Sequence, residues 1–121
     1  MGEISLNFRI LLYYNIPEKF WQVCVQCNNF DEEWAYIEIQ EFQAQRLFDE
    51  CRLEGTADNY VLSYILEKSL TFSEVDTWCR NHDFSDLLQK VVDMVLRIQQ
   101  KIKELIPEDY LPEEAKNDSQ I

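Results

Sequence analysis

The chain has 121 residues and a formal net charge of −12 at pH 7, with 46% hydrophobic and 13% aromatic residues. This length suits one domain with its own hydrophobic core, and the composition excludes a disordered chain. The charge disfavours direct binding to nucleic acid or to an anionic membrane, because like charges repel.

The N-terminal residues predict a β-strand. Apolar and polar side chains alternate over residues 4–14, which is the period of a half-buried strand. Leu11 and Tyr13 fall on the otherwise polar face, so we expect both faces of this strand to be covered near its end.

Residues 21–27 alternate in the same way and predict a second strand, ended by two asparagines. A helix beginning at Pro17 is the alternative, because Asn15 is a good N-cap residue and proline is favoured in the first helical turn. The β-branched residues in this stretch favour the strand.

Residues 34–40 alternate again and predict a third strand, followed by a helix over 41–54. Apolar residues recur at helical spacing in the second half of this stretch, and Gly55 is a natural residue to follow a helix C-terminus. Asp31 and the two glutamates after it also resemble a helix opening, so a continuous helix over 16–54 remains an alternative.

The rest of the chain is predicted to be helical. Thr56 or Asp58 can cap a helix whose apolar positions are Val61, Leu62, Ile65 and Leu66. Ser73 and Asp76 resemble a capping box for a short helix that continues through Cys79. The strongest helical pattern covers residues 85–106, where apolar residues repeat at three and four, and Pro107 ends it.

These elements predict a single α+β domain over residues 1–106 and an acidic, flexible tail over residues 107–121. A short antiparallel N-terminal β-meander packs against three or four helices, the longest of them C-terminal; an all-α bundle is the alternative. Only two glycines and three prolines are present, too few for the closely spaced turns of a many-stranded sandwich or barrel.

Cysteine spacing raises the hypothesis of a zinc-stabilised domain. Cys24-x-x-Cys27 and Cys79-x-x-His82 could supply four zinc ligands. Buried thiols without a cofactor are the favoured interpretation, because 51 residues separate the pairs and residues three apart in a strand point to opposite faces. No apolar run is long enough for a signal peptide or a membrane span, so we expect a cytoplasmic protein with reduced cysteines.

Catalytic motifs are weak. Glu38 with Glu41, and Asp83 with Asp86, are carboxylate pairs that could hold magnesium against a phosphate. A magnesium-dependent phosphate-processing enzyme is therefore a second alternative, although a chain with 23 acidic residues forms such pairs by chance. No phosphate-binding loop accompanies them, and His82 is the only histidine, so we do not expect an enzyme.

The acidic residues are unevenly distributed. Residues 31–76 hold twelve acidic and three basic residues, a net charge of −9, whereas residues 1–30 balance to zero. This pattern predicts a protein-binding module, such as an inhibitor, an antitoxin, an immunity protein or an adaptor. It would engage a basic partner, for example a nucleic-acid-binding protein or a toxin, by electrostatic complementarity. The expected binding residues are Asp31, Glu32, Glu33, Trp34, Glu38, Glu41, Asp49 and Glu50, with the tryptophan as an anchor. The broad apolar stripe of the last helix leaves a homo-oligomer open.

Overall fold

The computed structural model describes residues 5–50 and 54–105. These residues form five strands and three helices. In chain order the elements are β1 (Phe8–Asn15), β2 (Phe20–Cys27), β3 (Phe30–Ile39), α1 (Glu41–Glu50), β4 (Glu54–Ala57), β5 (Val61–Leu70), α2 (Phe72–Asn81) and α3 (Ser85–Leu105).

The strands form one antiparallel sheet in the order β3-β2-β1-β5-β4. The N-terminal meander is confirmed, and so are the α+β class and the longest helix at the C-terminal end of the described fold. The all-α alternative is wrong. β1 is the central strand because β5 returns to pair with it, which leaves β3 as a long edge strand and β4 as a short one.

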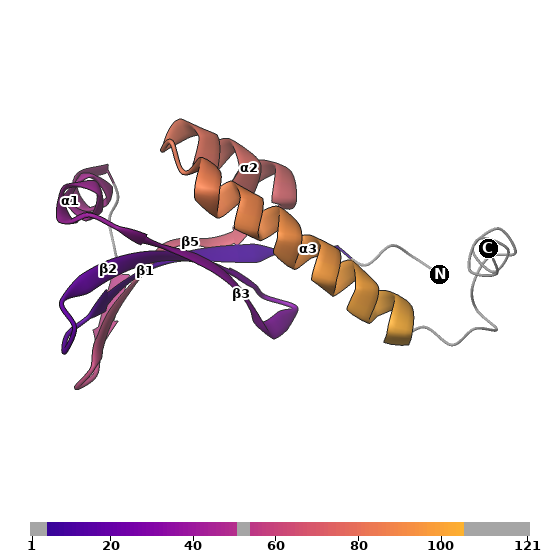
Figure 1. Cartoon of the computed structure of the whole chain (residues 1–121), viewed down its shortest axis with the longest axis horizontal. Helices are drawn as coiled ribbons and strands as arrows, with labels where there is room; N and C mark the ends of the chain where they lie inside the picture. Colours follow the sequence, from indigo (N-terminus) through magenta and orange to yellow (C-terminus); the bar gives the residue numbers. More distant parts are fainter. Residues whose placement is uncertain (1–4, 51–53, 106–121) are drawn as a thin grey trace, which may run out of the picture.

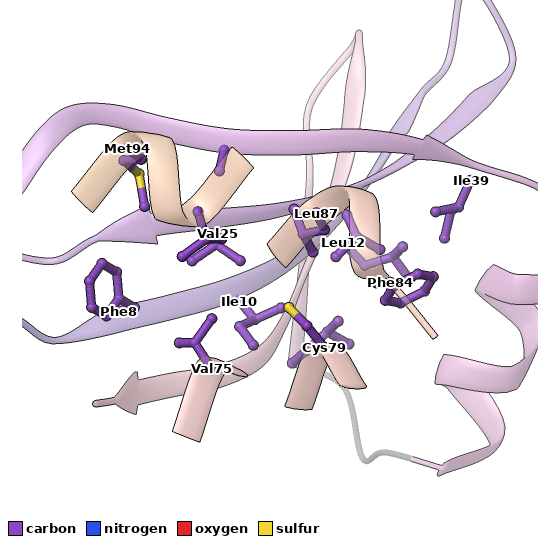
Figure 2. Close-up of a cluster of buried hydrophobic side chains, with 14 of the residues drawn as sticks. Phe8, Ile10, Leu12, Val25, Ile39, Val75, Cys79, Phe84, Leu87 and Met94 are labelled. Atoms are coloured by element: carbon purple, nitrogen blue, oxygen red, sulfur yellow. The ribbon is translucent and has the colours of Figure 1, made fainter. Parts of the chain in front are cut away.

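All three helices lie on one side of the sheet (Figure 1). Their buried side chains meet those of the strands in a single apolar core, part of which is shown in Figure 2. α1 contributes Ala44 and Leu47, α2 contributes Val75 and Cys79, and α3 contributes Leu87, Val91, Met94 and Ile98. The spacing of the α3 residues at three and four is what the sequence predicts for a helix with one buried face.

No described helix lies on the other side of the sheet (Figure 1), yet the second face of β1 is covered in part, as expected. Leu11 still has only 7% of its surface exposed, and the adjacent Cys24 only 2%. Side chains of the sheet itself provide this cover: the rings of Tyr13 and Trp34 lie 5.8 Å apart on the same face. This face is therefore a thin aromatic layer without helices over it.

The turn between β1 and β2 shows why residues 16–27 do not form a helix. The side chain of Asn15 accepts a hydrogen bond from the Glu18 amide at 3.0 Å, as a cap would. Lys19 then adopts a left-handed backbone conformation with a φ of 60°, which ends the turn and starts β2. Asn15 is thus not the N-cap of a helix, as the alternative required, because its side chain accepts a hydrogen bond within a hairpin turn.

Three other predictions are corrected. The predicted helix at residues 61–66 is strand β5. Glu54 and Gly55 lie in strand β4, so the helix predicted over 41–54 does not reach Glu54; α1 is described over Glu41–Glu50. The capping box of α2 is formed by Thr71 and Glu74, not by Ser73 and Asp76.

The predicted tail over residues 107–121 lies outside the described residues. None of the helices in the described ranges is long and apolar enough to cross a membrane.

Candidate functional site: two ends of strand β3

The predicted binding residues separate into two groups at opposite ends of β3. At the β2–β3 end, the carboxylates are engaged by cations of the same chain. Glu33 accepts hydrogen bonds from Arg97 Nε at 2.9 Å and from Lys101 Nζ at 3.1 Å, and Lys101 also reaches Glu32 at 3.2 Å. Both cations belong to α3, so these ion pairs fix the C-terminal half of that helix over the edge strand.

The acids of β3 and the cations of α3 influence each other's ionisation. Burial disfavours the charged form of Glu33, but the hydrogen bonds from Arg97 and Lys101 outweigh it and lower the pKa of this carboxyl. The pKa of Glu32 is lowered by its own backbone N–H and by Lys101. In return, Glu33 and Glu32 raise the pKa of Lys101. These acids serve the fold and are poorly placed to attract a partner.

Asp31 is also engaged. Arg9 Nη2 lies 3.8 Å from Asp31 Oδ1, and the same guanidinium donates to the buried Gln26 side chain. The Asp31 carbonyl accepts from Gln26 Nε2 at 2.6 Å and from Trp34 Nε1 at 2.9 Å. Trp34 is therefore half-buried and hydrogen-bonded, whereas Tyr36, two residues further along β3, is 51% exposed. The more accessible aromatic of this strand is Tyr36.

The second group lies where β3 passes into α1. Glu38 and Glu41 line a groove of about 330 Å³ whose other residues are Tyr14, Lys19, Phe20, Trp21, Ile39 and Gln40. Both carboxylates are exposed, and no cation in the described ranges forms an ion pair with either. One lysine, Lys19, shares the groove. The sequence predicted the two carboxylates but not the groove.

Two of the residues that line this groove, Tyr14 and Trp21, belong to an aromatic cluster. The ring of Trp21 lies 4.6 Å from that of Tyr14 and 5.5 Å from that of Phe48, and Phe48 stacks edge-on against Tyr64 at 4.9 Å. β1, β2, β5 and α1 each supply one ring. Carboxylates beside aromatic faces form a chemically suitable surface for the ammonium or guanidinium group of a lysine or arginine.

Helix α1 extends the acidic surface away from the groove. Asp49 is exposed two turns after Glu41 and accepts a hydrogen bond from Gln45 at 3.2 Å. The side chain of Glu50 lies outside the described part of the chain. Glu38, Glu41 and Asp49 are thus the predicted acids that are exposed and without an ion pair among the described residues.

The four predicted zinc ligands do not converge. Cys24 pairs with Leu11 on the uncovered face of the sheet, whereas Cys27 and Cys79 belong to the core. Within the described ranges no group of three or more histidine, cysteine or acidic side chains could hold a metal ion. Burial raises the pKa of Cys24 to about 12 and, with Asp76 nearby, that of Cys79 to about 11, so both remain protonated thiols.

Sequence reasoning missed the aromatic residues of the groove and the contact of Lys90 with β3. Tyr14 and Trp21 were assigned to the first two predicted strands and Phe20 to neither, and their meeting depends on a hairpin register that alternation does not define. Lys90 donates to the Tyr36 carbonyl at 3.1 Å across 54 residues of sequence.

Comparison with protein-family models, with curated proteins and with solved structures finds no match for this chain.

Proposed function

We propose that this chain is a non-enzymatic protein-binding module that engages a basic partner protein through the groove at Glu38 and Glu41. The observation that carries the proposal is a groove lined by two exposed carboxylates, which have no ion-pair partners among the described residues, and by the aromatic residues Tyr14, Phe20 and Trp21. An inhibitor, an antitoxin, an immunity protein or an adaptor would each use such a surface.

The mechanism follows from charge and geometry. The net charge of −12 accelerates the encounter with a cationic partner over a long range. A lysine or arginine of the partner then enters the groove, where its charged group meets Glu38 and Glu41 and its aliphatic stem lies on Trp21 or Phe20. The acids at the other end of β3 contribute less, because Lys101 and Arg97 already neutralise them.

Charge reversal in the groove tests the proposal. A short peptide of alternating lysine and threonine is titrated into the protein while the Trp21 indole N–H resonance is followed by NMR. We expect Glu38→Lys with Glu41→Lys to weaken binding about tenfold at low salt, since each lost surface pair contributes roughly 0.5–1 kcal/mol. The difference should shrink at high salt because the interaction is screened.

The matched control is Asp86→Lys with Glu104→Lys, which changes net charge by the same amount at two exposed positions of α3. We expect this control to retain most of the affinity. Equal weakening in the two double variants would show that only net charge matters, and would contradict a binding site in the groove.

A further inference from the structure

We infer that the basic partner is bound as an extended segment that adds to the free edge of β3 as a further strand of the sheet. This inference rests on the proposed function, because the added strand would lead its cationic side chains to Glu38 and the groove. It assigns a binding role to the backbone of β3.

One hydrogen bond shows which backbone groups of β3 point away from β2. The Tyr36 carbonyl accepts a hydrogen bond from Lys90 of α3, so it points away from β2. In an antiparallel ladder, every second residue directs both its N–H and its C=O to the same side. Trp34 and Glu38 therefore also direct their backbone groups outward, and no side chain within the described ranges bonds to them. An unpaired edge of this length is a template for another strand.

Space beside the edge is available. A cavity of about 180 Å³ lies between β3 and α3, lined by Trp34, Ala35, Tyr36, Lys90, Asp93 and Arg97. The exposed ring of Tyr36 stands on the uncovered face next to it. An added strand would place alternate side chains against this ring and against Asp93, while its backbone pairs with β3.

Charge selects the occupant. β3 contains four acidic residues and no lysine or arginine. Cations of the chain already pair with Asp31, Glu32 and Glu33, so Glu38 is the acid of this strand that is available to a partner. A second copy of this strand would place acids beside acids, which is unfavourable for directly opposed positions. A segment with lysine or arginine at alternate positions would instead face Glu38 with a cation. The partner segment is thus extended and basic.

Lys90 competes for the same edge. Its ammonium group lies 3.1 Å from the Tyr36 carbonyl and 5.5 Å from the centroid of the Tyr36 ring. An incoming strand has to displace this contact. Lys90→Met should therefore bind the lysine–threonine peptide about two- to fivefold more tightly than Lys103→Met, since one competing hydrogen bond is removed at equal net charge.

The decisive experiment compares two N-methylated forms of that peptide. One form is methylated on all lysine amides and the other on all threonine amides, so they carry the same charge and the same number of methyl groups. We expect one form to lose binding by more than about tenfold, because several backbone hydrogen bonds are blocked, and the other to bind nearly as the parent does. Equal binding by both forms would overturn strand addition.

A protein variant gives an independent measurement. Tyr36→Pro removes an outward N–H without breaking a bond to β2, and an edge strand tolerates proline at such a position. Tyr36→Ala, which loses the same ring, is its control. We expect the proline variant to bind the peptide at least about fivefold more weakly than the alanine variant. If circular dichroism shows that the proline variant is unfolded, the methylated peptides alone decide.

The possible failures differ from one another. If the peptide binds in a manner that depends on Glu38 and Glu41 but neither methylation pattern nor Tyr36→Pro matters, strand addition is wrong and the proposed function stands. If the groove variants have no effect, the proposed function itself fails. A wild-type dimer that Tyr36→Pro abolishes would assign the edge to a second copy and overturn the inference.

Discussion

The ring of Tyr64 occupies the space where a side chain on Gly55 would begin. A Cβ atom at Gly55 would lie 2.6 Å from Cδ1 and 2.7 Å from Cε1 of that ring. Phe48, at 4.9 Å, and Trp21, at 6.4 Å, hold the ring from other sides. The glycine of β4 thus allows the rings of Tyr64, Phe48 and Trp21 to pack together.

We therefore expect Gly55→Ala to lower the free energy of unfolding by about 1–3 kcal/mol, because the ring must shift within a packed cluster. Urea denaturation measures this change. Thr56→Ala, the neighbouring substitution, loses only an exposed hydroxyl contact with Ser63 and should cost less than about 1 kcal/mol. If Gly55→Ala lowers the free energy of unfolding by the same amount in a Tyr64→Ala variant, the clash with the Tyr64 ring is not the cause.

At the scale of the element, α2 depends on a reciprocal cap. Thr71 Oγ1 accepts from the Glu74 amide at 3.2 Å, and Glu74 Oε1 accepts from the Thr71 amide at 3.0 Å. The cap stabilises the helix that carries Val75 and Cys79 into the core. It satisfies two backbone groups that the first turn would otherwise leave unpaired.

Thr71→Ala should accordingly destabilise the protein by about 0.5–2 kcal/mol. Ser73→Ala should have an effect close to zero, because the Ser73 hydroxyl has no part in the cap. Thermal and urea unfolding of the two variants provide the measurement. If Ser73→Ala destabilises the protein more than Thr71→Ala does, the capping box predicted at Ser73 and Asp76 is the correct one.

Element prediction succeeded for α3, which has one apolar face, and failed for β5, which has apolar residues on both faces. α3 has a single buried stripe, and both the pattern and the structure begin it at Ser85. β5 has apolar residues on both faces: Leu62 and Leu66 face the core side, and Val61 and Ile65 face the uncovered side. Spacing by one, four and five residues imitates a helix. Only the pairing of β5 with β1, between residues far apart in sequence, resolves the ambiguity.

On the scale of the whole molecule, the acidic stretch does not form one negative face. Glu32 and Glu33 are neutralised from α3, whereas Glu38, Glu41 and Asp49 remain available. The sequence could indicate that the acids are segregated along the chain. It could not indicate which ones the cations of α3 would reach, because Arg97 and Lys101 are more than 60 residues away from Glu33 in sequence.

The Glu33 ion pairs make stability depend on pH. Because folding lowers the pKa of Glu33, its stabilising contribution is present above the unfolded carboxyl pKa, near 4.3, and is lost as the pH falls through the folded value. Glu33→Gln should lower the free energy of unfolding at pH 7 by about 1–3 kcal/mol. The difference from wild type should shrink below about pH 4.

Urea titrations at several pH values measure this dependence. The control is Glu104→Gln, which changes an exposed residue of α3. Its free energy of unfolding should differ little from that of the wild type at any pH. A Glu33→Gln penalty that stays constant from neutral to acidic pH would mean that shape, and not charge, holds α3 on β3.

The central position of β1 has a consequence for synthesis of the protein. β1 needs β5 along its second edge, and β5 ends at Leu70. Until a ribosome has made β5, the most apolar strand of the sheet has at least one open side, and its side chains Phe8, Ile10 and Leu12 lack the helices that later bury them. The nascent chain is thus vulnerable to misassociation until more than half of it has emerged, and folding concludes late.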